Sequence, residues 1–402
     1  MSAVLRVQLG EGSGTPYLPL AEIAPLVRRE VQIDLDEMYT ELGVRSFNKG
    51  TFHRRCVQGA EFNWQDLYRI RAGDLVFSNI MAWEGAVALA GAADEDCVGN
   101  HRMLTCECDR KRVVPAFIAE YFKTHEGMSK LVAASTGTVA RNRTLTATAL
   151  SKITVPSPPL EQQRAVVARL DALAGKTREV EAHLDAVERD AARLIRSYLL
   201  GRDREQPTMR RMSELVSQRQ PDVAVDGTAQ YRFAGVYSFG RGVFPSAVKM
   251  GSEFSYQRLS TVRAGDFVYP KLMAWEGALG VVPTECDGMV VSPEFPVFTV
   301  NTEAVLAEVL DIYFRTPDIW PALAEISGGT NARRRRLQPS TFLSYQMPVP
   351  SMAKQLELRA IYQRTQLLKT RHAAIRKANV ALLPATLERI FNATTQGASH
   401  GQ

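Results

Sequence analysis

Arg71-Ala72-Gly73-Asp74-Leu75-Val76-Phe77 and Arg263-Ala264-Gly265-Asp266-Phe267-Val268-Tyr269 are two copies of one segment, 192 residues apart. A second stretch, Met81-Ala82-Trp83-Glu84-Gly85-Ala86, returns at the same spacing as Met273-Ala274-Trp275-Glu276-Gly277-Ala278. In the 16-residue window from 71 to 86, 11 positions are identical in the second copy, whereas unrelated segments share about one. The chain therefore contains an internal duplication. Its period is too long for a solenoid, whose repeats span roughly 20–50 residues.

The same offset relates residues over most of each copy. Matches include Leu20 with Met212, Tyr39 with Tyr231, Ser46-Phe47 with Ser238-Phe239, Tyr121-Phe122 with Tyr313-Phe314, and Arg143 with Arg335. At the end of each copy we align Val155-Pro156 with Val349-Pro350, which implies that the offset drifts to 194. Two copies of one large unit predict a pseudo-two-fold protein.

Composition limits the class of protein. The 402 residues suit two to three domains, and 45% apolar with 23% charged residues is typical of a soluble globular chain. The sequence has neither a long apolar stretch nor a signal peptide, so we expect a cytoplasmic location. Its net charge of +6 is compatible with an anionic partner but does not establish one.

Each copy begins with a mixed region. Leu75 to Ile80 and Phe267 to Leu272 follow the Arg-Ala-Gly-Asp turn signal and are rich in strand-forming residues. Pro115 to Lys123 and Ala304 to Phe314 have the apolar spacing of helices. The fold class predicted for this region is α+β.

Each copy ends in a heptad segment, in which apolar residues alternate steps of four and three. The first contains Val166, Leu170, Leu173, Thr177, Val180, Leu184, Val187, Ala191, Leu194 and Tyr198, and Gly201 is a plausible C-cap. The second contains Ile361, Thr365, Leu368, His372, Ile375, Asn379 and Leu382. Pro384 is expected to end or kink the second helix, and Leu387, Ile390 and Phe391 to form a capping cluster.

A single heptad seam cannot bury its own apolar face, so we expect the two helices to pair as an antiparallel coiled coil. The polar seam residues Thr177, His372 and Asn379 lower stability but can fix the register. The predicted domains are 1–155, helix 156–201, 202–350, helix 351–392 and a disordered tail, 393–402.

The start of the first helix resembles that of the specificity subunits of type I restriction–modification systems. The resemblance rests on Val155-Pro156-Ser157-Pro158-Pro159-Leu160-Glu161-Gln162-Gln163-Arg164, on the Arg-Ala-Gly-Asp pattern of each copy, and on the order of domains and helices. The second helix start departs from the family's form, with Ser351-Met352-Ala353-Lys354-Gln355-Leu356-Glu357 in its place.

The resemblance implies two related target-recognition domains, each reading one half of a bipartite DNA site, joined by helices that set the spacer. It also implies partners: double-stranded DNA, two methyltransferase subunits docked on the helices, and restriction–translocase subunits that join them. S-adenosylmethionine, ATP and Mg²⁺ are expected on those partners, and no cofactor is expected on this chain.

The sequence shows no chemistry of its own. It lacks an Asn/Asp-Pro-Pro-aromatic methyltransferase loop and a G-x-x-x-x-G-K-[ST] nucleotide loop. Cys106-x-Cys108 has no answering pair, so we expect no metal site and five reduced thiols. We therefore predict a recognition subunit that is not an enzyme. A coiled-coil adaptor without DNA and a stand-alone DNA-modifying enzyme are the alternatives.

Two loops in each copy carry residues suited to DNA. The first follows a Ser-x-Gly-Thr stretch, and its candidate contacts are Arg141, Asn142, Arg143, Asn331, Arg333, Arg334, Arg335 and Arg336. The second spans 45–50 and 237–242, with candidates Arg45, Asn48, Lys49 and Arg241. Asn79 and Lys271 differ beside a shared framework and are candidate readout positions. Trp83, Trp275, Glu84 and Glu276 are identical between copies, which favours a scaffold role, because two different half-sites need different readers.

Overall fold

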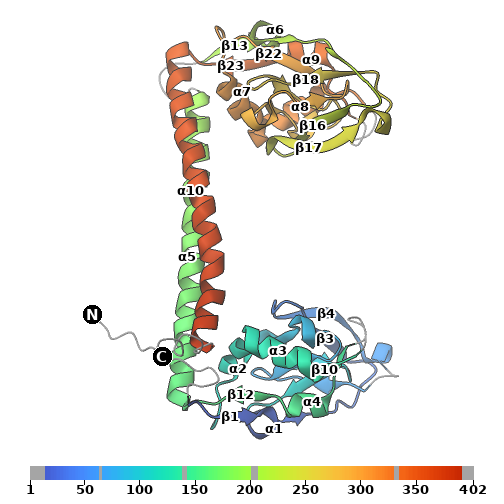
Figure 1. Cartoon of the computed structure of the whole chain (residues 1–402), viewed down its shortest axis with the longest axis vertical. Coiled ribbons are helices and arrows are strands. Elements are labelled where there is room, and N and C mark those ends of the chain that lie inside the picture. The colour runs from blue at the N-terminus through green and yellow to red at the C-terminus, as the bar shows by residue number, and fades with distance from the viewer. Residues whose placement is uncertain (1–13, 63–65, 138–142, 201–206, 330–334, 392–402) are drawn as a thin grey trace, which may run out of the picture. The chain divides into compact units, whose positions relative to one another are not determined.

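The computed structural model describes residues 14–62, 66–137, 143–200, 207–329 and 335–391 (Figure 1). The chain divides into two compact units, each described here by itself. Unit 1 comprises residues 1–181 and 375–402, and unit 2 comprises residues 182–374. The predicted disordered tail, 393–402, lies outside the described residues.

Unit 1 is a mixed α+β structure. Its strands are β1 (Tyr17–Pro19), β2 (Leu26–Val27), β3 (Met38–Val44), β4 (Thr51–Gln58), β5 (Tyr68–Arg69), β6 (Leu75–Ser78), β7 (Val87–Leu89), β8 (Val98–Gly99), β9 (Met103–Cys106), β10 (Ser135–Thr136), β11 (Thr144–Leu145) and β12 (Thr154–Pro156). Its helices are α1 (Leu20–Ile23), η1 (Gly59–Phe62), η2 (Ala82–Glu84), η3 (Ala92–Asp94), α2 (Pro115–Tyr121), α3 (His125–Ala134) and α4 (Ala147–Ser151), with part of α5 (Leu160–Leu199) and of α10 (Met352–Phe391).

Unit 2 contains strands β13 (Thr208–Arg211), β14 (Val216–Gln218), β15 (Val223–Ala224), β16 (Gln230–Tyr237), β17 (Gly242–Met250), β18 (Arg258–Thr261), β19 (Phe267–Val268), β20 (Gly280–Val281), β21 (Val290–Val291), β22 (Val297–Val300) and β23 (Gln346–Val349). Its helices are α6 (Met212–Leu215), η5 (Gly251–Glu253), η6 (Ala274–Glu276), η7 (Thr284–Cys286), α7 (Ala307–Phe314), η8 (Pro317–Ile319), α8 (Trp320–Ile326) and α9 (Pro339–Ser344), with the remaining parts of α5 and α10.

The two units repeat one topology. The sheet order β2-β9-β6-β7 in unit 1 corresponds to β14-β22-β19-β20 in unit 2, and β4-β3-β8-β5 corresponds to β17-β16-β21-β18, to which β15 is added. A strand pair also closes each unit, β1 with β12 and β13 with β23. The α+β prediction and the duplication are both confirmed.

The register of the closing strand pairs corrects one alignment. Pro19 pairs with Thr154, and Arg211 pairs with Gln346. Arg211 follows Pro19 by 192 residues, and Gln346 follows Thr154 by the same number. The expected drift to 194 was therefore wrong. The repeated Val-Pro dipeptide misled the comparison, because Pro156 corresponds in the sheet to Pro348 and not to Pro350.

The two long helices are antiparallel within each unit. In unit 1, Val166 and Leu170 of α5 share a buried core with Leu387 and Phe391 near the end of α10. In unit 2, Ile195 and Leu199 near the end of α5 share a core with Leu358 near the start of α10. The predicted pairing of the heptad segments is confirmed in each unit.

The polar seam residues bond across the helix pair. Asn379 Nδ2 donates to the carbonyl oxygen of Thr177 and to Glu181 Oε1, both at 3.0 Å, in unit 1. In unit 2, His372 Nδ1 lies 2.8 Å from Glu188 Oε1, and the His372 side chain is buried. Each of these contacts links one position on α5 with one on α10, as expected for residues that fix a register.

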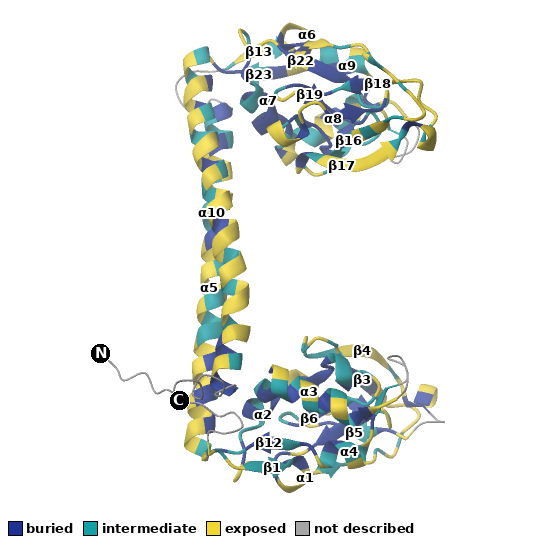
Figure 2. Ribbon diagram, in the orientation of Figure 1, coloured by how far each residue is buried: buried dark blue, intermediate teal, exposed yellow. Residues whose placement is uncertain are grey.

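The predicted seam is displaced at its later positions. Leu194 is 59% exposed, whereas its neighbour Ile195 is buried, and on α10 Ile375 and Leu382 are each 44% exposed (Figure 2). A straight α-helix drifts by about 20° per heptad relative to a strict seven-residue repeat. Over the four heptads from Val166 to Leu194, that drift amounts to most of one residue position.

Helix α10 continues through Pro384 to Phe391, so Pro384 does not end the helix, which was one of the two effects expected of it. An internal proline costs about 3 kcal/mol. Beyond it, Leu387, Ile390 and Phe391 are buried in the core of unit 1. Burial of such side chains contributes about 1.5–3 kcal/mol each, which is enough to offset the proline.

Candidate nucleic-acid interface

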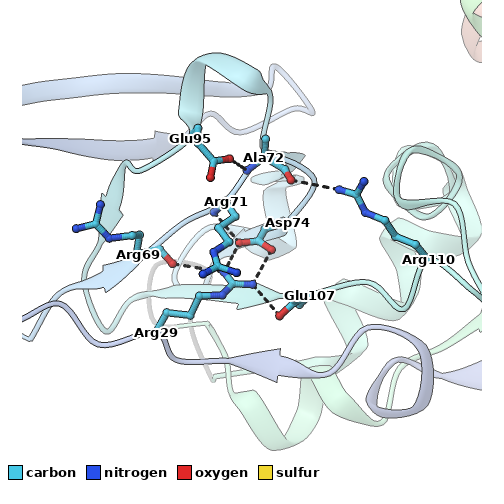
Figure 3. A network of polar contacts seen from close by, with 8 residues as sticks. All are labelled: Arg29, Arg69, Arg71, Ala72, Asp74, Glu95, Glu107 and Arg110. Carbon is cyan, nitrogen blue, oxygen red and sulfur yellow. Dashed lines mark hydrogen bonds and ion pairs between the residues drawn. The ribbon is translucent and has the colours of Figure 1, made fainter.

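The Arg-Ala-Gly-Asp turn of unit 1 is held by a polar network around Asp74 (Figure 3). Asp74 Oδ2 accepts a hydrogen bond from the backbone N–H of Arg71 at 2.9 Å, and Arg29 Nη1 lies 2.6 Å from the same oxygen. The hydrogen bond to Asp74 raises the pKa of the Arg29 guanidinium. The backbone N–H of Ala72 donates to Glu95 Oε2 at 2.6 Å. These contacts fasten the turn that leads into β6.

Unit 2 repeats the network. Asp266 Oδ2 accepts from the backbone N–H of Arg263 and lies 2.7 Å from Arg219 Nη1. The backbone N–H of Ala264 donates to Asp287 Oδ1 at 2.8 Å, as Ala72 does to Glu95. The Arg-Ala-Gly-Asp identity therefore reflects a structural turn, which fixes the strand leading to the Trp-Glu-Gly segment.

Each unit presents one hairpin whose outer strand is largely exposed. The hairpins are β3–β4 and β16–β17, and β4 and β17 lie at sheet edges (Figure 2). At the hairpin tips Phe47 and Asn48 have φ of 61° and 54°, and Phe239 and Gly240 have φ of 62° and 64°. Two successive positive φ values are typical of the tight type I′ hairpin turn. These tips lie within the second predicted DNA loop.

The Trp-Glu-Gly segment supports the hairpin tip in both units. Phe47 N–H donates to the carbonyl oxygen of Glu84 at 2.8 Å, and Asn48 N–H donates to that of Gly85 at 2.9 Å. In unit 2, Phe239 and Gly240 make the same bonds to Glu276 and Gly277, at 2.8 and 3.0 Å. The expected scaffold role of Glu84 and Glu276 has a physical basis here, through their main-chain carbonyl groups.

A glycine is required where the supporting turn ends. Gly85 and Gly277 both have φ of 77°, a region that side chains rarely adopt. A Cβ at Gly277 would lie 2.3 Å from Trp320, and a Cβ at Gly85 would lie 3.1 Å from Asn48 Oδ1. In unit 1 this close approach lets the hairpin tip pack directly on the turn, and in unit 2 the corresponding space is filled by Trp320 of α8.

The first predicted DNA loop of each unit, which contains Arg143 or Arg335 and which we call the basic loop, contacts the same turn. Arg143 lies over the ring of Trp83, with Cζ 5.8 Å from the ring centroid, and Arg335 lies over Trp275 at 5.9 Å. Both tryptophan side chains are partly buried. We call the hairpin tip, the Trp-Glu-Gly turn and this arginine the tip cluster, which comprises 45–50, 82–85 and Arg143 in unit 1, and 237–242, 274–277 and Arg335 in unit 2.

Other candidate cations surround the tips. Arg45 is exposed, lies 4.6 Å from the Phe52 ring, and donates from Nη1 to the Thr51 carbonyl oxygen. Lys49 Nζ lies 5.7 Å from the ring of Phe47. Arg241 lies 4.4 Å from the ring of Tyr237. Aromatic rings thus hold these charges at the surface.

Asn79 and Lys271 occupy one place in the two units. The carbonyl oxygen of Asn79 accepts from Leu145 N–H at 2.8 Å, and that of Lys271 accepts from Leu337 N–H at 2.8 Å. The residues that donate these bonds, Leu145 and Leu337, lie two positions after Arg143 and Arg335. Lys271 Nζ donates to the Pro293 carbonyl oxygen. The structure brings these candidates close to the basic loops.

A cavity opens beside Asn79 in unit 1. Its lining includes Phe52 and Arg54 from β4, together with Ser78, Ile80 and Arg102. Arg54 is half exposed and lies 2.9 Å from Glu41. Glu41 lines the same cavity, so its walls carry both positive and negative side chains.

Several predicted contacts cannot be placed. Arg141, Asn142, Asn331, Arg333 and Arg334 lie outside the described residues. Arg336 is described, and its Nη1 lies 2.7 Å from Glu294 Oε2 on the surface.

Two pairs of aromatic residues in the tip clusters were not among the predicted DNA contacts. Trp83 and Trp275 were assigned to the scaffold alone, and the tip residues Phe47 and Phe239 were passed over within their loop. A signal was available, because arginine, tryptophan and phenylalanine are all kept at the same offset.

One group in unit 1 has the donor atoms of a metal site. His53 Nε2 lies 3.1 Å from Asp94 Oδ1 and 3.7 Å from Cys97 Sγ. Asp94 also accepts from Gly91 N–H and from Thr51 Oγ1, and burial raises the pKa of the Cys97 thiol. Unit 2 has Pro245, Cys286 and Met289 at these positions. The group is best explained as a fastening between β4 and η3.

Two mixed units, each built on part of an antiparallel pair of long helices, define the fold of type I restriction–modification S subunits. The chain is similar to the HsdS subunit from Thermoanaerobacter tengcongensis, with a TM-score of 0.58, 18% identity, and coverage of 95% of this chain and 97% of that one. It is also similar to a chain from a structure concerned with complex assembly and conformational transition of the type I R-M system, with a TM-score of 0.66, 17% identity, and coverage of 95% and 99%.

No protein-family profile and no curated protein matches the sequence. Among the described helices, none combines the length and apolar character needed to span a membrane.

Proposed function

We propose that this chain is the DNA-specificity subunit of a type I restriction–modification complex. The observation that carries the proposal is the repeated tip cluster, which joins both predicted DNA loops in each unit through one arginine–tryptophan contact. The fold shared with S subunits supports it. The chain contributes recognition, and adenine methylation or cleavage takes place on cytoplasmic partner subunits that carry S-adenosylmethionine, ATP and Mg²⁺.

Residues that are identical between the two units and residues that differ between them have separate roles in DNA binding. Arg143 and Arg335 are identical between the units, so they suit phosphate contacts, which position the protein without reading sequence. The readout positions lie among those that differ, which include Arg45 and Tyr237, Asn48 and Gly240, Lys49 and Arg241, Asn79 and Lys271, and Asn142 and Arg334. Each unit would thus hold DNA in the same way and read a different half-site.

The helix pair has the second role, as a spacer and a docking surface for two methyltransferase subunits. The seam contacts at Asn379 and His372 hold α5 and α10 in one register within each unit. A fixed register is what a spacer between half-sites requires.

The test is selection of duplexes from a randomised pool by the chain together with the subunits that co-purify with it. We expect a bipartite, non-palindromic site. Arg143→Ala and Arg335→Ala should each weaken binding to all sequences and reduce the slope of log affinity against log salt by about 1. Lys111→Ala removes one exposed positive charge from the segment before α2, outside the tip clusters and the long helices, and serves as the control.

Two outcomes would replace the proposal. Partner subunits that bind without any selected DNA would favour a coiled-coil adaptor. Transfer of labelled methyl groups by the purified chain alone would favour a stand-alone enzyme.

A further inference from the structure

Each tip cluster carries a largely exposed phenylalanine. Phe47 is 69% exposed in unit 1, and Phe239 is 63% exposed in unit 2. The two residues are separated by 192 positions and lie at the same point of equivalent hairpins. A large apolar side chain held in water at the same place twice calls for a partner, because its exposure costs free energy in the isolated chain.

The backbone at both residues is unfavourable for phenylalanine. With φ of 61° and 62° they adopt the left-handed conformation, which asparagine and glycine accept far more readily than bulky residues. Main-chain bonds from Phe47 to Glu84 and from Phe239 to Glu276 keep the tips in place. Backbone strain that the surroundings enforce is concentrated at functional sites. Here the strain directs the aromatic ring outward.

The surroundings of the two rings favour a nucleic acid. Lys49 lies beside the Phe47 ring, and Arg45 and Arg241 flank the tips, while Arg143 and Arg335 reach the turns that support them. Each tip therefore combines one largely exposed aromatic ring with several cations, and in unit 2 the Phe239 ring also lies 6.2 Å from that of Trp320. Proteins that kink DNA insert single apolar side chains of this kind between base steps while basic residues hold the phosphates.

The identity of the two residues excludes base readout as their main task, because the half-sites of a non-palindromic target differ. We propose that Phe47 and Phe239 are wedges, each of which inserts at a base step in its half-site and partly unstacks it. This inference rests on the proposed function. Such a wedge makes specificity depend on how easily the local sequence deforms, in addition to direct contacts.

The test uses the full chain with its co-purifying subunits and the selected duplex. 2-Aminopurine replaces each adenine in turn, except the adenine that becomes methylated, since fluorescence of this base rises when it unstacks. We expect a severalfold rise near one step in each half-site. Phe47→Asn should abolish the rise in one half only, and Phe239→Asn in the other half only.

The substitutions are chosen so that folding does not obscure the result. Asparagine suits a positive φ, so the melting temperature of each variant should be equal to or higher than that of the original chain. Leu35→Asn and Val248→Asn replace exposed apolar residues away from the tips, and they should leave the fluorescence pattern unchanged.

The outcomes separate this inference from the proposed function. Sequence-selective binding with a fluorescence pattern that both asparagine variants retain would overturn the wedges and leave DNA recognition standing. Loss of partner-subunit binding in these variants, with DNA unstacking retained, would overturn the wedges in favour of a protein-docking role. Absence of any selective binding by the original complex would overturn both.

Discussion

Gln163 and Gln355 make the same three hydrogen bonds at the starts of α5 and α10. The Gln163 amide accepts from Val114 N–H and donates to the carbonyl oxygens of Arg112 and Pro158. Gln355 accepts from Leu306 N–H and donates to the carbonyl oxygens of Ala304 and Pro350. Both side chains are almost completely buried. Each glutamine therefore ties a long helix to the N-terminus of the preceding domain helix, α2 or α7.

Replacing either glutamine should destabilise its unit. Gln163→Ala leaves one buried N–H and two carbonyl groups without their partner, and each unsatisfied buried group costs about 1–3 kcal/mol. We expect a loss of at least about 2 kcal/mol in the free energy of unfolding, measured by urea denaturation. Gln162→Ala, at the exposed neighbouring position, should change it by less than about 0.5 kcal/mol. Equal losses in the two variants would contradict the assigned role.

The second helix start shows where sequence reasoning reached its limit. The segment from Ser351 to Glu357 departs from the pattern of the first helix start. It nevertheless contains a glutamine, Gln355, whose side-chain amide makes the same contacts as that of Gln163. Identity over a long motif was informative for α5, but the physical requirement is a single buried glutamine. The expected drift to 194 aligned Gln163 with Glu357, whereas the constant offset of 192 aligns it with Gln355.

Repetition at a fixed offset predicted the architecture well, because packing of one core constrains many positions in both copies. The tip cluster was only partly predicted. Its two loops were chosen from charge, but their meeting at Trp83 depends on long-range contacts that join residue 47 to 84 and 83 to 143. The later seam positions failed for a different reason, since the 3.5-residue repeat does not follow the 3.6-residue helix indefinitely.

Asn379→Leu should raise the free energy of unfolding and make the register and partner choice of the α5–α10 helix pair less specific. Asn379 bonds Thr177 and Glu181 across the helix pair, and a partly buried polar seam residue can fix the register at a cost in stability. We expect the free energy of unfolding to rise by roughly 1 kcal/mol. Light scattering should at the same time detect oligomers that the original chain does not form. A fall in stability without new species would show that Asn379 contributes net stabilisation.

Cysteine labelling should distinguish buried from exposed thiols. Burial raises the pKa of Cys106 to about 12 and that of Cys108 to about 12, whereas Cys56 is exposed. Since the thiolate is the reactive form, iodoacetamide at pH 8 should modify Cys56 first, and Cys106 and Cys108 only after unfolding. Between the ordinary thiol pKa of about 9 and about 12, only the unfolded chain loses these protons, so stability should fall as pH rises through that range. Rapid labelling of Cys106 in the folded chain would contradict its burial.

Removing one acidic charge from unit 2 should strengthen DNA binding. Glu294 holds Arg336 in a surface ion pair, with side chains 41% and 46% exposed, and such pairs contribute at most about 1 kcal/mol. Glu294→Gln should therefore leave the melting temperature almost unchanged while it releases Arg336, which directly follows Arg335. If Arg336 then contacts a phosphate, affinity at low salt should rise severalfold and the salt slope should steepen by about 0.9. Glu303→Gln removes the same charge from the loop before α7 and is the control. An equal gain in both variants would indicate only a change in net charge, and no gain in Glu294→Gln would place Arg336 away from the DNA.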